Sequence, residues 1–112
     1  MNKQLPIIDL EFGKKLSGGR EDIALEMIAM LRAELPKDFL KIKTAFEKND
    51  FSAMQVDAHR LHGAVSYCGA PALKLAVSEL ELALKNNLKQ KIPTFFSKLE
   101  FEVNRFLEIT HE

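Results

Sequence analysis

Apolar residues recur every three or four positions along most of this chain, and that spacing restricts the chain to helices that each bury one face. No segment keeps the two-residue alternation of an amphipathic strand, and no internal repeat is found. We therefore predict an all-α fold. Three of the apolar stripes consist of Ile28, Leu31, Leu35, Phe39, Ile42 and Phe46; of Leu73, Val77, Leu80, Leu84 and Leu88; and of Phe96, Leu99, Val103, Phe106 and Thr110.

Turn-forming residues interrupt the stripes and set the expected helix boundaries. They occur at Ser17-Gly18-Gly19, Asn49-Asp50, Gly69 with Pro71, and Asn86-Asn87 before Pro93. The expected elements are a short helix over 9–16 and four main helices over 20–48, 51–68, 70–87 and from Pro93 onward. Short connections favour an antiparallel, up-down-up-down four-helix bundle with an extra N-terminal helix. Pro36 should kink or divide the helix over 20–48, because proline lacks a backbone donor and crowds the preceding turn.

Length and charge narrow the functional classes. A chain of 112 residues fits one domain, with 1–7 as a loose lead-in and 8–112 as the bundle. Sixteen basic and sixteen acidic residues give no electrostatic reason to expect nucleic acid or an anionic membrane as partner. No apolar run is long enough to span a bilayer, and a single cysteine suits a reducing compartment. We therefore expect a cytoplasmic protein. We also expect a monomer, since no long exposed apolar seam is visible.

The helix over 51–68 has two different faces. On a helical wheel with Met54 at zero, the residues within about 40° of it form the buried face. His59 falls at about 140° on that wheel, with His62 at about 80° and Gly63 at about 180°. His59 should therefore point away from the core. The residues of the buried face are Met54, Ala58, Leu61, Val65 and Cys68.

Gly63 lies one turn beyond His59 and needs a reason, because glycine inside a helix costs about 1 kcal/mol relative to alanine. One reason is access: without a β-carbon, another molecule can approach the imidazole closely. The other is a tight contact with a neighbouring helix. His59 itself could be an ordinary surface residue. Met27 and Met30 lie off the main stripe of their helix and either contact a partner or widen the core.

The segment Ala58-His59-Arg60-Leu61-His62-Gly63-Ala64 resembles the His-x-Leu-Lys-Gly signature of histidine phosphotransfer (HPt) domains. The continuation from Val65 to Leu73, with Tyr-x-Gly-x-Pro inside it, looks like the same family, as does Glu79-Leu80-Glu81. The stretch from Met27 to Asp50 resembles the family's preceding helix and turn. The likeness covers about residues 8–110 and is strongest to the C-terminal HPt domains of BarA/GacS-like hybrid sensor kinases.

The resemblance implies a phosphoryl carrier of two-component phosphorelays. His59 would accept a phosphoryl group from a receiver-domain aspartate of a hybrid sensor kinase and pass it to the receiver aspartate of a response regulator. Gly63 would leave room for the receiver. His62 stands where the signature has lysine, and could stabilise the phosphoryl group. Mg²⁺ would be supplied by the receiver, so the chain needs no cofactor and is no enzyme by itself. A hybrid sensor containing it would be a histidine kinase, with this domain at its cytoplasmic C-terminus.

Two alternatives remain open from the residues. His59 and His62 are three apart and could chelate a metal together, whereas Cys68 lies on the opposite face and looks like an inert core thiol. Glu108-x-x-His111 is one half of a di-iron motif at a frayed end. The second alternative is a helical protein–protein interaction module without phosphotransfer, which predicts no role for an outward histidine beside a glycine.

Overall fold

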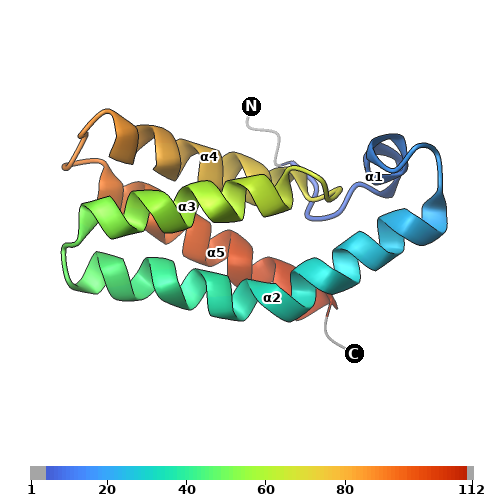
Figure 1. The fold of residues 1–112 in the computed structure, drawn as a ribbon, viewed down its shortest axis with the longest axis horizontal. Helices are drawn as coiled ribbons and strands as arrows, with labels where there is room; N and C mark the ends of the chain where they lie inside the picture. The colour runs from blue at the N-terminus through green and yellow to red at the C-terminus, as the bar shows by residue number, and fades with distance from the viewer. Residues whose placement is uncertain (1–4, 111–112) are drawn as a thin grey trace.

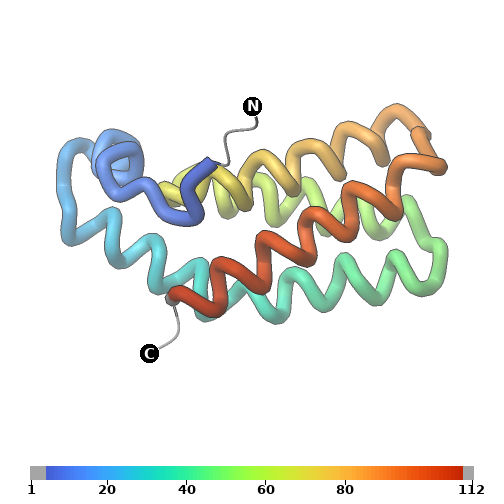
Figure 2. The backbone as a smooth tube through the Cα atoms, turned by 180° about the vertical axis from the view of Figure 1, so that it is seen from behind, coloured from blue at the N-terminus to red at the C-terminus, as the bar shows by residue number. Residues whose placement is uncertain are grey.

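The computed structural model describes residues 5–110 and forms an antiparallel four-helix bundle with one short additional helix (Figure 1). Consecutive helices pack against each other, and α2 also contacts α5, which closes the bundle. Seen from behind, α5 crosses the bundle obliquely (Figure 2). The expected all-α architecture is confirmed. The helices are α1 at Leu10–Leu16, α2 at Glu21–Glu47, α3 at Phe51–Val65, α4 at Pro71–Lys85 and α5 at Ile92–Thr110.

The side chains of two aspartates cap the starts of helices. The side chain of Asp9 accepts a hydrogen bond from the backbone N–H of Phe12 at 3.0 Å, and Asp50 accepts one from Ala53 at 3.1 Å. Each satisfies a donor that the first turn of a helix would otherwise leave without a partner. Asn49, immediately before the Asp50 cap, has a φ of 53°, the left-handed conformation that turns the chain from α2 into α3.

Two helices end earlier than expected. α3 stops at Val65, since Ser66 to Ala70 form a tight turn in which Cys68 N–H donates to the Val65 carbonyl at 3.0 Å. Cys68 is nevertheless buried, as expected. α4 stops at Lys85, because Asn87 takes a left-handed φ of 54°. Leu88 therefore lies outside the helix and is 41% exposed, so its assignment to the apolar stripe was wrong.

Pro36 does not divide α2, which runs unbroken for 27 residues. The helix instead changes direction part of the way along (Figure 1), as expected of a helix with an internal proline. The apolar stripe of α2 packs into the core. There the ring of Phe39 stacks on Phe96 with 5.5 Å between the ring centroids, and the ring of Phe46 stacks on Phe96 at 4.3 Å. None of the helices within 5–110 has the length and apolar composition that a bilayer-spanning segment needs.

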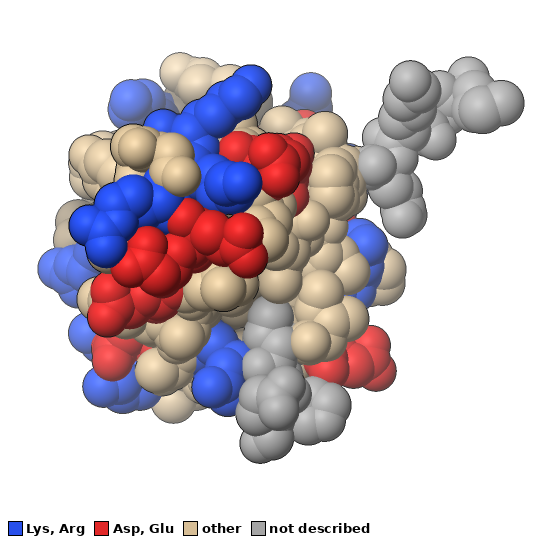
Figure 3. Space-filling model, turned by 90° about the vertical axis from the view of Figure 1, so that its right-hand side faces the viewer, with Lys and Arg blue, Asp and Glu red and all other residues tan. Residues whose placement is uncertain are grey.

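The end of the bundle beside α1 carries both signs of charge. Figure 3 looks onto this end and shows Lys and Arg side chains next to Asp and Glu side chains. Two ion pairs belong to α1 and the start of α2: Lys14 with Glu11 at 3.8 Å and Arg20 with Asp22 at 2.7 Å. These pairs are wholly or partly exposed and should contribute little to stability.

The N-terminal segment is fastened to the α3–α4 turn by close backbone contact. Asp9 N–H donates to the Gly69 carbonyl at 2.8 Å, and Ala72 N–H donates to the Pro6 carbonyl at 3.1 Å. A β-carbon on Gly69 would collide with the Asp9 carbonyl oxygen and lie 2.9 Å from the Gly13 nitrogen. Both obstacles are backbone atoms, which cannot turn aside as a flexible side chain does. Glycine at 69 is therefore required for α1 to pack.

Replacing Gly69 with alanine should lower the free energy of unfolding by about 1–3 kcal/mol, the usual cost of overpacking. Gly63→Ala is the matched control, because a β-carbon there meets no heavy atom within 4 Å. Alanine favours a helix interior over glycine by about 1 kcal/mol, so this variant should be stabilised. Urea denaturation of both variants measures the two effects. Equal effects of the two substitutions would contradict the packing described at Gly69.

Candidate functional site

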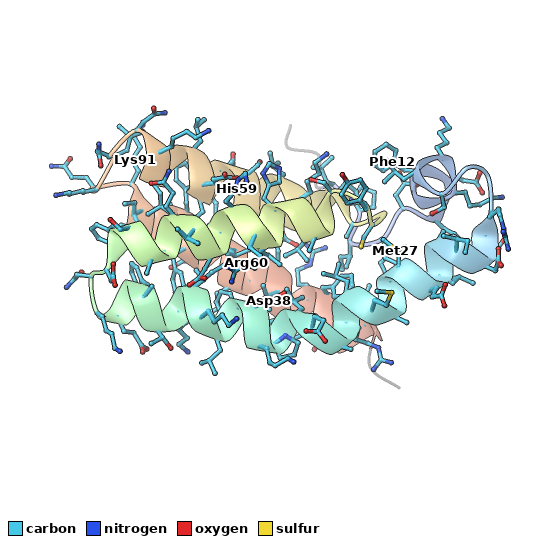
Figure 4. All side chains as sticks on the ribbon, viewed as in Figure 1. Phe12, Met27, Asp38, His59, Arg60 and Lys91 are labelled. Carbon is cyan, nitrogen blue, oxygen red and sulfur yellow. The ribbon has the colours of Figure 1, made fainter. Side chains whose placement is uncertain are left out.

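The two faces predicted for α3 are present. The side chain of His59 is 78% exposed, whereas Met54, Ala58, Leu61 and Val65 are buried. In Figure 4, His59 lies on the side of α3 nearer α4, and Arg60 lies on the side nearer α2. α3 thus presents His59 to solvent from the middle of a helix that the bundle holds by its opposite face.

Glu81, from the facing side of α4, links the two histidines of α3. Its Oε2 lies 2.5 Å from His59 Nδ1, and its Oε1 lies 2.7 Å from His62 Nδ1. The Glu81 side chain is only 10% exposed, against 30% for His62. One buried carboxylate therefore holds both imidazoles, each through the same ring nitrogen.

The charge of Glu81 is set by opposing effects. Burial by itself raises the pKa of this carboxyl, but hydrogen bonds from His59 and His62, with their charge interactions, lower the pKa below its ordinary value. Glu81 is therefore ionised at neutral pH, and an ionised carboxylate can only accept hydrogen bonds. Each Nδ1 must then donate, so in the neutral imidazoles the free lone pair lies on Nε2.

Stability at acidic pH should depend on Glu81. A carboxyl whose pKa is lower in the folded state stabilises the fold above its unfolded pKa, and this contribution is lost as the pH falls through the folded value. We expect the wild type to begin losing it below pH 4.5, the ordinary value for this carboxyl. Glu81→Gln, which cannot titrate, should show a shallower decline of the urea midpoint with falling pH. Parallel declines in the two proteins would show that Glu81 makes no such contribution.

Gly63 lies beside this site and makes no internal contact that requires glycine. A β-carbon built there meets no heavy atom within 4 Å, so the tight helix–helix contact considered from the sequence is wrong. The close approach that requires glycine is instead at Gly69, in the α3–α4 turn, where a β-carbon would meet the backbone of Asp9 and Gly13. The surface next to His59 and His62 is open to an approaching molecule.

Other residues near the site differ in their exposure. Met30 and Tyr67 are exposed, at 58% and 65%, whereas Met27 packs against the core. Arg60 is exposed and lies 3.6 Å from Asp57. Cys68 is buried, and its burial raises the pKa of the thiol, which favours the inert form.

Sequence reasoning overlooked Glu81 as part of the site, although a signal was present. Glu81 follows Val77 by four positions and Leu80 by one, which places an acidic residue at the edge of the apolar stripe of α4. A buried carboxylate needs partners, and the histidines of α3 were the nearest candidates. The pairing itself depends on how α3 and α4 are aligned, which periodicity does not give.

The metal alternatives receive no three-ligand arrangement. Across residues 5–110, no group of three or more His, Cys, Asp and Glu side chains is placed to hold a metal ion. His111 of the Glu-x-x-His motif lies outside the described residues.

Comparison with known proteins gives a consistent result. The sequence profile of the family described as "Hpt domain" matches residues 26–108. The chain is 43% identical over 82 residues to the sensor histidine kinase GacS of Pseudomonas protegens, a match covering 73% of this chain and 9% of that protein. The chain thus spans about a tenth of the length of that relative.

Solved structures agree in fold. The HPT domain of a hybrid sensor histidine kinase from Shewanella has a TM-score of 0.72 at 30% identity, over 92% of both chains. Histidine-containing phosphotransfer protein B from Pseudomonas aeruginosa PAO1 has a TM-score of 0.77 at 21% identity, over 93% of this chain and 90% of that one. With an outward histidine on a four-helix bundle and a family match over most of its length, this chain belongs to the Hpt domain family, the phosphoryl carriers of phosphorelays.

Proposed function

We propose that His59 is the residue of this chain that carries the phosphoryl group, with Nε2 as the reacting atom. The observation that supports this is the contact between His59 and Glu81. Nδ1 of His59 lies 2.5 Å from the buried Glu81 carboxylate, while the His59 side chain itself is 78% exposed. Nδ1 is occupied as a donor, so the remaining nitrogen of the ring is the nucleophile and can be reached by a partner.

In the proposed transfer, one bond to phosphorus forms at His59 as another breaks at the receiver. The Nε2 lone pair attacks the phosphorus of the aspartyl phosphate on a receiver domain. The new P–N bond forms as the P–O bond to the aspartate breaks, and the aspartate leaves as a carboxylate. The proton on Nδ1 stays in place, so the phosphorylated ring carries a positive charge that Glu81 neutralises at hydrogen-bond distance. Attack on the phosphorus by a second receiver aspartate reverses these changes.

His62 and Gly63 have supporting roles in this proposal. Glu81 also holds Nδ1 of His62, at 2.7 Å, so His62 Nε2 donates a hydrogen bond to the phosphoryl group when the ring is protonated, and the ring then supplies a positive charge as well. Gly63 leaves the approach to His59 free, because no heavy atom beyond its own helical backbone and its two chain neighbours lies within 4 Å of where its β-carbon would be.

The partners are receiver domains, of a hybrid sensor kinase on one side and of a response regulator on the other. Phosphoryl transfer requires in-line positioning and neutralisation of charge, and we propose that the receiver supplies the Mg²⁺ for the latter. The chain then needs no cofactor of its own and works as a cytoplasmic monomer. Any kinase activity would belong to a longer protein such as the GacS relatives, of which the match covers 9%.

Peptide mapping tests the acceptor atom and residue together. A receiver domain labelled with ³²P on its aspartate is mixed with the chain in Mg²⁺, and the labelled chain is digested and analysed by mass spectrometry that preserves acid-labile groups. We expect an acid-labile, base-stable label on the peptide carrying His59, with ³¹P and ¹⁵N chemical shifts of an Nε2-phosphorylated ring. Label on His62, or an Nδ1 linkage, would overturn the assignment. Binding of several receivers without any label would favour the interaction module instead.

A further inference from the structure

We infer that His59 and His62 together form a binding site for a borderline divalent transition-metal ion such as Zn²⁺, and that the ion blocks phosphoryl transfer by occupying His59 Nε2. The ion in this proposal is a competitor, separate from the Mg²⁺ of the receiver and from any resident cofactor. The binding part stands on the geometry of this chain alone, whereas the blocking part rests on the proposed function.

Glu81 fixes the direction in which the two histidine rings point. Glu81 occupies Nδ1 of both rings, at 2.5 and 2.7 Å, with a different carboxylate oxygen for each. Both lone pairs are therefore on Nε2, on the far side of each ring from the carboxylate. A metal-binding histidine in proteins almost always donates its second nitrogen to such an outer carboxylate or carbonyl, which fixes the ring and raises its basicity. The outer part of a two-histidine site is already built.

His59 and His62 lie close to each other on α3. Residues three apart on a helix are neighbours on its surface, with β-carbons about 5–6 Å apart. The rings of His59 and His62 are further restricted, because they meet the two oxygens of a single carboxylate. The side chain of His59 is 78% exposed, so no core residue is displaced when an ion binds there.

An ion bound to the two histidines also needs room for its remaining ligands. Two imidazoles supply half of a tetrahedral shell, and water must complete it. Beside Gly63, no heavy atom other than those of its own helical backbone and its two chain neighbours lies within 4 Å of the β-carbon position, so coordinated water can be accommodated. The same open surface that admits a receiver therefore admits a hydrated ion. With two protein ligands the site should bind more weakly than a closed four-ligand zinc site.

Ligand chemistry selects the ion. Imidazole nitrogen suits Zn²⁺, Cu²⁺ and Ni²⁺, whereas Mg²⁺ prefers oxygen ligands. The lone pair of His59 Nε2 that would attack phosphorus is the one that coordinates the ion, so a chain cannot bind the ion at His59 and accept a phosphoryl group there at once. A physiological excess of Mg²⁺ should not displace Zn²⁺ from these nitrogens.

Calorimetric titration of the metal-free chain with Zn²⁺ tests binding without any receiver. We expect one saturable site per chain, at least tenfold weaker in His59→Gln and in His62→Gln. Glu81→Gln should weaken it by about 10–100-fold, as outer-shell substitutions do. His111→Gln is the matched control and should bind as the wild type does. No saturable binding in the wild type, or a loss that follows His111 instead of His59 and His62, would overturn the proposal.

A transfer assay then separates this inference from the proposed function. The rate of labelling by a phosphorylated receiver is measured in Mg²⁺, with and without Zn²⁺, for the wild type and for His62→Gln. We expect Zn²⁺ to slow the wild type by a larger factor than the variant, because only the wild type keeps both ligands. Equal slowing would place the effect on the receiver and refute the block at His59. Saturable zinc binding by a chain that no receiver labels would leave the site standing and remove the proposed function.

Discussion

His59→Gln should reduce phosphoryl labelling of the chain to background while leaving the fold intact. Glutamine has no ring nitrogen to attack an aspartyl phosphate, so the carrier step is removed at its reacting atom. The side chain is 78% exposed, and its one described polar contact is to Glu81, which retains His62. Glutamine also offers an amide N–H to the carboxylate. The free energy of unfolding should therefore change by no more than about 1 kcal/mol.

His62→Gln is the matched control for this experiment. It removes the other imidazole that is hydrogen-bonded to Glu81, at 2.7 Å compared with 2.5 Å for His59, but leaves His59 in place. It should still acquire a base-stable label, at a rate that reports how much His62 assists. Both variants are mixed with the same phosphorylated receiver, and the fraction of label transferred is followed with time. Transfer to His59→Gln but not to His62→Gln would move the acceptor to His62.

Periodicity was sufficient to predict the bundle because the core is built from it. The residues expected on the buried face of the helix over 51–68 are buried, and Asp9 and Asp50 accept the hydrogen bonds of helix caps at the expected helix starts. Each of these features depends on neighbours within one helical turn, which a sequence shows directly. The outward direction of His59 follows from the same reasoning, since a helix with one face in the core must expose the other.

The failures occur where residues distant in sequence meet. Glu81 is 22 positions from His59, and nothing local indicates that the two touch. Gly69 looked like a helix terminator, yet its stronger constraint is the backbone of Asp9 and Gly13 pressed against it. Leu88 continued a numerical pattern past the point where Asn87 turns the chain. Helix alignment and loop closure set these contacts, and a periodic pattern contains neither.

Leu61→Ala should destabilise the chain by about 2–5 kcal/mol, because truncating a buried leucine removes its transfer free energy and leaves a cavity. Leu61 is 0% exposed and lies in α3 between Arg60 and His62 in sequence. It anchors the helix from the face opposite His59. At roughly 4 °C per kcal/mol for a domain of this size, the melting temperature should fall by about 8–20 °C.

Val56→Ala supplies the comparison on the same helix. Val56 is 57% exposed, so removing two methyl groups there leaves no cavity, and the effect should stay within about 0.5 kcal/mol. Urea denaturation and thermal melting, followed by far-ultraviolet circular dichroism, measure both variants. A loss for Val56→Ala as large as that for Leu61→Ala would mean that α3 is rotated from the orientation described. The outward position of His59 depends on that orientation, so the stability measurement also tests the site without using any partner.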